Sequence, residues 1–113
     1  MRKILLLGLF VSTPIFADYT CIGKINNINQ GRKGTISIIS PDMFGDSYGR
    51  KICSLTEIWK GVNPEACKGW LSKLLVAKTS NKKLFVQYVD ATSCKSQPSW
   101  SAANAPWAIW EAE

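Results

Sequence analysis

The residues that could carry out chemistry are few, and their types argue against catalysis. The chain has no histidine, so the commonest general base is missing, and no serine or cysteine stands in a recognisable nucleophile motif. A glycosidase would need two acids held together, and no spacing in the chain brings two together. The acids considered are Asp42, Asp46, Glu57, Glu65 and Asp90. We therefore expect a protein that is not an enzyme and that uses no cofactor.

Tryptophans are the more informative candidates. Five occur, and three of them lie within the last fourteen residues. An exposed indole offers a flat apolar face on which a sugar ring stacks, and we predict Trp59 and Trp100 as the ligand-binding residues. Trp107 is a further candidate for such a surface, but packing in the core or against a sheet is the favoured expectation for it and for the other two, because a small domain gains much from each large aromatic side chain that it buries. These three residues are Trp70, Trp107 and Trp110.

Four cysteines are the residues that metal or redox chemistry would use. Cys21, Cys53, Cys67 and Cys94 are spaced 32, 14 and 27 residues apart, with no CxxC motif, so no metal site is expected. An even number of cysteines in a short exported chain predicts two disulfides. Pairing of Cys94 with Cys67, with Cys21 or with Cys53 is sterically acceptable, and the spacing does not choose among them.

The N-terminus has the layout of a secretory signal peptide. Two basic residues precede an apolar run over 4–11, and Ala17 supplies a small residue for cleavage. The run is far shorter than the roughly 20 residues that a membrane-spanning helix needs. We expect residues 1–17 to be removed, leaving one domain over 18–113 that is periplasmic or secreted and has no membrane span.

Charge is mildly positive and scattered. The formal net charge of +6 falls to +4 over residues 18–113, where 12 basic residues stand against 8 acidic ones. Pairs occur at Arg32-Lys33, Arg50-Lys51 and Lys82-Lys83, but no run of five basic residues exists. This pattern is typical of a solvated surface and argues against nucleic acid as the partner.

Local signals predict five strands and one helix. β-Branched runs between Gly, Asn and Pro residues indicate the strands. Asn63-Pro64-Glu65 predicts a helix start, with an N-cap, a proline at the first helical position and an acid at the positive end of the dipole. Apolar residues at spacings of three and four continue the helix to about Asn81. The expected strands cover 19–28, 35–40, 51–55, 84–90 and 107–111.

The order β-β-β-α-β-β predicts a mostly β fold with one helix, an OB-like five-stranded barrel stapled by disulfides. The chain also resembles the secreted OB-fold B subunits of the subtilase, pertussis and typhoid toxin group, and small exported bacterial proteins of similar layout. The resemblance is in Tyr19-Thr20-Cys21-Ile22, Ile52-Cys53-Ser54-Leu55 before Trp59, the helix, and Lys83-Leu84-Phe85-Val86-Gln87-Tyr88.

Two kinds of binding function follow. The resemblance implies a subunit that forms a homo-oligomer and binds glycans, although no glycan-binding residue of the toxin group maps onto this chain. The alternative is a monomeric periplasmic domain that binds another protein, as an inhibitor or immunity-type partner, through strand edges or the apolar face around Phe85 and Val89. Single-stranded nucleic acid ranks below both, because an exported domain seldom meets it.

Overall fold

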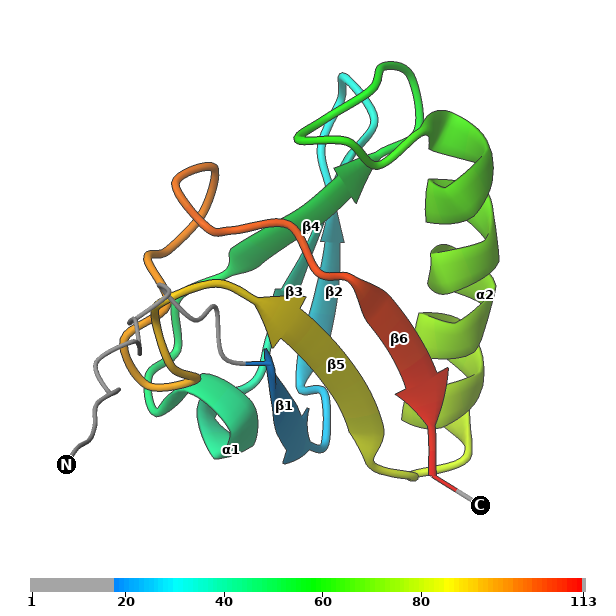
Figure 1. Ribbon diagram of the computed structural model, residues 1–113. Coiled ribbons are helices and arrows are strands. Elements are labelled where there is room, and N and C mark those ends of the chain that lie inside the picture. Colours follow the sequence, from blue (N-terminus) through cyan, green and yellow to red (C-terminus); the bar gives the residue numbers. More distant parts are fainter. Residues whose placement is uncertain (1–17, 113) are drawn as a thin grey trace, which may run out of the picture.

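The structure, a computed structural model, describes residues 18–112 and contains two three-stranded antiparallel sheets (Figure 1). The first sheet has the strand order β1-β5-β6, and the second has the order β2-β3-β4. The expected signal peptide, residues 1–17, lies outside the described residues. The strands are β1 (Asp18–Gly23), β2 (Asn27–Gln30), β3 (Thr35–Ile39), β4 (Arg50–Ser54), β5 (Leu84–Val89) and β6 (Ala108–Glu111).

The expected five-stranded OB-like barrel is wrong, because six strands form two separate sheets and no barrel closes among residues 18–112. The strand predicted over 19–28 is broken after Gly23. Its first part pairs with β5 and its second part pairs with β3, so the two parts enter different sheets. A Cβ at Gly23 would lie 2.9 Å from Asp42 Oδ2, and the chain there packs closely against the short helix α1 (Pro41–Phe44).

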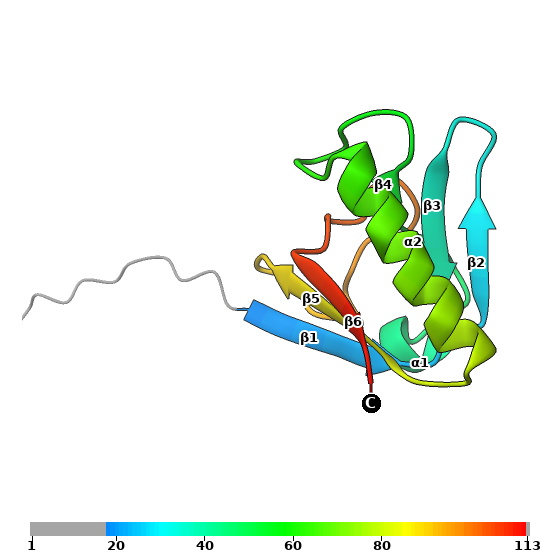
Figure 2. The ribbon, with the colours of Figure 1, turned by 90° about the vertical axis from the view of Figure 1, so that its right-hand side faces the viewer.

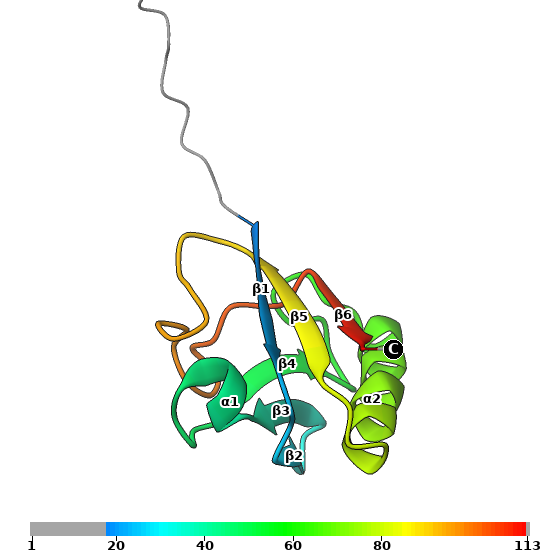
Figure 3. The ribbon, with the colours of Figure 1, turned by 90° about the horizontal axis from the view of Figure 1, so that it is seen from below.

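The core lies between the two sheets. Figure 3 shows the sheets against each other, with α1 at one side and α2 (Pro64–Thr79) at the other. Alternate residues of β5 point inward as the sequence predicts, since Leu84, Val86 and Tyr88 are each 0% exposed. The second sheet and α2 supply the facing apolar side chains, Ile36, Ile38, Ile52, Leu74 and Ala77.

The predicted helix is confirmed as α2. The Asn63 side chain accepts a hydrogen bond from the Ala66 N–H at 2.8 Å, and Pro64 occupies the first helical position. Figure 2 shows α2 alongside β6, and it also contacts β4, so it closes one side of both sheets. α2 has 16 residues, and no helix in the described part is long and apolar enough to cross a membrane.

Both expected disulfides are present, and the structure settles their pairing. Cys53 in β4 is bonded to Cys67 in α2, which joins the second sheet to the helix. Cys21 in β1 is bonded to Cys94 in the loop after β5. The second bond therefore ties the first strand to the long segment that leads from β5 to β6.

Candidate binding site

A pocket of about 300 Å³ opens beside the start of α2. Its walls are residues 60–63, Ala66 and Trp70 of α2, and residues 105–107. Trp107 is 73% exposed, the largest exposed fraction among the large apolar side chains of the described chain, and Trp70 is half-buried. The pocket thus combines an indole that is open to solvent with one that is partly packed.

A tight turn forms one wall of the pocket. Trp59 and Val62 exchange both backbone hydrogen bonds, at 3.0 and 2.9 Å. The two residues between them, Lys60 and Gly61, have φ values of 47° and 86°, which is the type I′ conformation that suits a two-residue hairpin loop. Glycine adopts this conformation freely, but lysine does so at a cost. The turn therefore holds Lys60 at its tip in a strained conformation of a kind that clusters at functional sites.

Two side chains give the pocket polar character. The Asn63 oxygen is occupied by the helix cap, so its amide nitrogen is the group left for a ligand, as a donor. The Lys60 ammonium donates a hydrogen bond of 2.7 Å to the Ala103 carbonyl oxygen, and its other two N–H groups have no partner among the described residues. The pocket can donate hydrogen bonds at its rim while offering aromatic surface inside.

Trp59 lies next to the pocket, and the ammonium groups of two lysines approach its ring. The Lys60 Nζ is 5.0 Å from the centroid of its indole ring, and the Lys51 Nζ is 4.9 Å from the same centroid. Both distances are in the range of cation–π attraction. Lys51 comes from β4 and is only 7% exposed. We call Lys51, Trp59 and Lys60 the lysine–indole cluster.

A polar network holds the segment that forms the far wall of the pocket. Tyr19 donates to Asp90 at 2.9 Å and accepts from the Gln97 amide at 2.6 Å. Gln97 accepts from the Asn104 backbone N–H at 2.9 Å. Burial is the main reason that the pKa of Tyr19 rises to about 12. The network fixes residues 97–104, which lead directly to Trp107.

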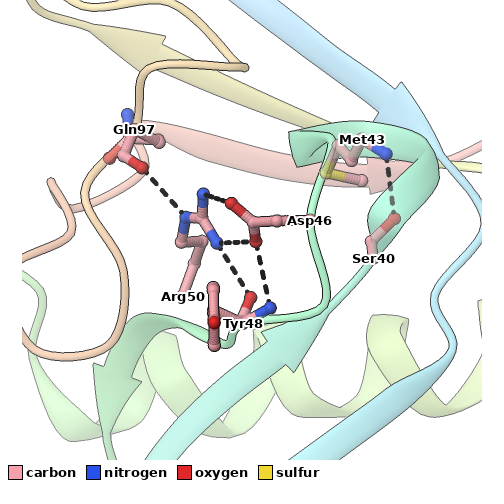
Figure 4. Close-up of polar contacts among 6 residues, drawn as sticks. All are labelled: Ser40, Met43, Asp46, Tyr48, Arg50 and Gln97. Carbon is pink, nitrogen blue, oxygen red and sulfur yellow. Dashed lines mark hydrogen bonds and ion pairs between the residues drawn. The ribbon is translucent and has the colours of Figure 1, made fainter.

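Arg50 also binds this segment, through Gln97 (Figure 4). It is 1% exposed, and its Nε donates to the Gln97 carbonyl oxygen at 3.1 Å. Its two terminal nitrogens bind both carboxylate oxygens of Asp46, at 2.7 and 3.0 Å. The guanidinium carbon also lies 4.8 Å from the centroid of the Phe44 ring. Arg50 therefore joins α1, the loop after it and the 97–104 segment.

Acid should weaken the contact between Arg50 and Asp46. The hydrogen bonds from Arg50 hold the pKa of Asp46 at about 2, below the usual 3.8. A folded-state pKa below the unfolded value gives stability that is present above about pH 4 and is lost as the pH falls towards 2. We expect Asp46→Asn to flatten the decrease in unfolding free energy between pH 4 and pH 2, measured by urea titration. An equally steep decrease in the variant would show that Asp46 is not responsible.

The two predicted ligand-binding residues both contact Lys51. Trp59 contacts its ammonium through the indole. The backbone carbonyl oxygen of Trp100 accepts a hydrogen bond from the Lys51 backbone N–H at 3.2 Å, and the Trp100 ring packs against Gly49 while the residue stays 43% exposed. Neither tryptophan lines the pocket. Trp59 and Trp100 thus both lie near Lys51, whereas the pocket is lined by Trp107.

The structure places Trp107, Arg50 and Lys51 differently from what the sequence predicts. Trp107 was expected to be packed, but β6 begins only at Ala108, so strand alternation does not extend to residue 107. The Trp107 backbone N–H donates to the Gln87 carbonyl oxygen at 2.7 Å, while the side chain is exposed. The Arg50-Lys51 pair was expected on a solvated surface, and both residues are buried. Trp110 is stacked on Phe85 with ring centroids 5.4 Å apart, and it is 38% exposed.

Comparison with protein families, with curated proteins and with solved structures gives no match to this chain. Within residues 18–112, no group of three or more His, Cys, Asp or Glu side chains is placed to hold a metal ion. The fold and the site together define a small disulfide-bonded domain of two sheets, with one aromatic pocket beside a pair of lysines.

Proposed function

We propose that this chain is an exported, non-enzymatic binding module that takes a carbohydrate into the pocket at Trp107. The observation that carries the proposal is an indole 73% exposed at a pocket of about 300 Å³. A domain of this size gains stability from each large aromatic that it buries, so an indole left outside the core costs stability that it would otherwise add. A ligand that stacks on the indole accounts for that cost.

The lining suits a sugar better than a wholly apolar ligand. The C–H groups of a sugar ring pack on the negative face of an indole, which Trp107 offers. Sugar hydroxyls accept hydrogen bonds, and Asn63 and Lys60 supply donors at the rim. A mostly apolar pocket with a few placed polar groups is the usual form of a small-ligand site. The two disulfides support the exported location, because such bonds persist in oxidising compartments.

The test is a change at Trp107 in the mature, oxidised protein. A glycan array identifies the ligand, and calorimetry then measures its affinity. We expect Trp107→Ala to weaken binding at least about tenfold, as truncation of a central tryptophan commonly does. Tyr48→Ala is the matched control, since Tyr48 is 61% exposed and does not line the pocket. Equal losses in both variants, or none in Trp107→Ala, would contradict the proposal.

Light scattering on the same protein tests the homo-oligomer that the toxin-group resemblance implies. Repeated weak sites on one assembly raise the overall affinity for a multivalent glycan surface. A monomer that binds no glycan on the array would instead support the alternative function, recognition of another protein.

A further inference from the structure

Lys51 occupies an unusual environment for a lysine. All five residues of β4 are buried, and Lys51 is 7% exposed. Lysine is almost never buried to this extent unless it is paired with an opposite charge. Burial to this extent is therefore expected to come with a partner for the charge, either within the chain or outside it.

The described chain supplies no such partner. Its ion pairs are Arg50–Asp46, Lys68–Glu65 and Lys73–Glu111, and none of them includes Lys51. The Lys51 Nζ also makes no hydrogen bond within residues 18–112, yet it is not among the fully enclosed polar atoms, so it keeps access to solvent. The Trp59 ring attracts the charge, but a ring face cannot accept the three hydrogen bonds that an ammonium offers.

A second cation lies near the first. Lys60 Nζ and Lys51 Nζ each lie about 5 Å from one ring centroid, so the two charges are at most about 10 Å apart. Lys60 is held there by Ala103 and by the strained turn. Two like charges at this distance repel each other. The arrangement becomes favourable when an anion approaches both.

The cluster is continuous with the pocket, because Lys60 belongs to both. The first turn of α2 also lines the pocket through Asn63 and Ala66, which adds the positive end of a helix dipole to the same region. A ligand in the pocket thus meets Lys60 and the start of α2, and Lys51 approaches the same indole ring as Lys60. No carboxylate of the described chain lies within 4 Å of either ammonium of the cluster.

We propose that the lysine–indole cluster is a subsite for an oxyanion substituent of the ligand, and that the carbohydrate is therefore an acidic polysaccharide. This inference rests on the proposed function. One sugar ring stacks at Trp107, and a carboxylate or sulfate ester on the chain contacts Lys51 and Lys60. The same chemistry can come from a uronic acid, a sulfated sugar or a free anion, and the experiment separates these sources.

The probes are three hexasaccharides and inorganic sulfate. The hexasaccharides are built from galacturonic acid, from sulfated galactose and from unmodified galactose, which is neutral. The variant is Lys51→Met, which removes the charge and keeps the length of the side chain. Lys68→Met is the control, because it changes the net charge equally at an exposed residue of α2. Calorimetry measures affinity, and thermal unfolding reports the fold.

We expect the unmodified protein to bind an acidic hexasaccharide more tightly than the neutral one. Lys51→Met should weaken binding of the acidic hexasaccharide at least about tenfold, because hydrogen bonds to charged groups are the strong ones. Binding of neutral galactose should stay the same. The melting temperature should stay about the same, because the Lys51 ammonium makes no ion pair within the described residues and keeps access to solvent. A structural role for Lys51 would instead lower the melting temperature. The better acidic hexasaccharide names the substituent, and inorganic sulfate that competes at millimolar concentration shows that the anion alone suffices.

Equal effects of Lys51→Met and Lys68→Met would overturn the inference, because attraction would then depend only on net charge. Tighter binding of single-stranded DNA than of any hexasaccharide would also overturn it. The two proposals fail separately. If Trp107→Ala abolishes sugar binding but acidic and neutral chains bind alike, only the subsite is wrong. If Lys51→Met removes anion binding and Trp107→Ala changes nothing, only the carbohydrate pocket is wrong.

Discussion

Replacing Cys21 and Cys94 together by serine is expected to lower the free energy of unfolding by about 4 kcal/mol. A disulfide restricts the unfolded chain more strongly when it closes a longer loop, and these cysteines are 73 residues apart. The bond also ties β1 to the loop that carries the polar network, since Tyr19 and Gln97 lie on its two sides. Urea titration of the oxidised proteins measures the change.

The second disulfide provides the matched comparison. Cys53 and Cys67 are only 14 residues apart, and the same reasoning predicts a loss of about 3 kcal/mol when both become serine. The loss from Cys21 and Cys94 should therefore be larger by about 1 kcal/mol. If the shorter loop proved the more stabilising, packing around Cys67 in the core would outweigh chain entropy, and the ranking would be wrong.

Local chemistry explains what the sequence predicted well. The start of α2 depends on Asn63 and Pro64, whose roles as N-cap and first helical residue need no distant contact. The inward face of β5 follows from simple alternation. In both cases the physical cause lies within a few residues, so the sequence alone is enough to predict the structure there.

The sheet arrangement depends on contacts that are distant in sequence, and that is why the barrel prediction failed. Cys21 is paired with Val86 across β1 and β5, and no local pattern specifies that pairing. The break after Gly23 is equally hidden, because it reflects the approach of Asp42 from α1. The choice among disulfide pairings was open for the same reason, since it depends on which strands become neighbours.

The site was only partly predictable. Trp59 was a predicted ligand residue and lies beside the pocket, but the exposure of Trp107 depends on where β6 begins. The burial of Lys51 was not visible either, because a basic pair in a short strand has the composition of a surface. Lys60-Gly61 was a usable sequence signal, because a two-residue type I′ turn favours glycine at its second position. A turn at Lys60-Gly61 predicts that Trp59 and Val62 face each other across it.

The largest effect expected from a single substitution is that of Arg50→Ala, which should cost about 3 kcal/mol of unfolding free energy. Arg50 is among the largest fully buried side chains, and its removal leaves a cavity as well as unpaired carbonyl oxygens on Gln97 and Tyr48. Asp46 loses its partner too, but it is partly exposed and is hydrated by solvent. Thermal and urea unfolding measure the loss.

Two further variants separate the parts of this effect. Arg50→Lys keeps the positive charge but cannot grip Asp46 with two parallel hydrogen bonds, so it should retain only part of the stability. Arg32→Ala, at an exposed arginine, should change the free energy of unfolding by less than about 0.5 kcal/mol. Arg50 also holds residues 97–104, which precede Trp107. We therefore expect Arg50→Lys to weaken both ligand binding and stability, whereas Trp107→Ala should weaken ligand binding alone. A stable Arg50→Ala protein with full affinity would show that the pocket does not depend on Arg50 and that the turn at Lys60 and the start of α2 are enough to form it.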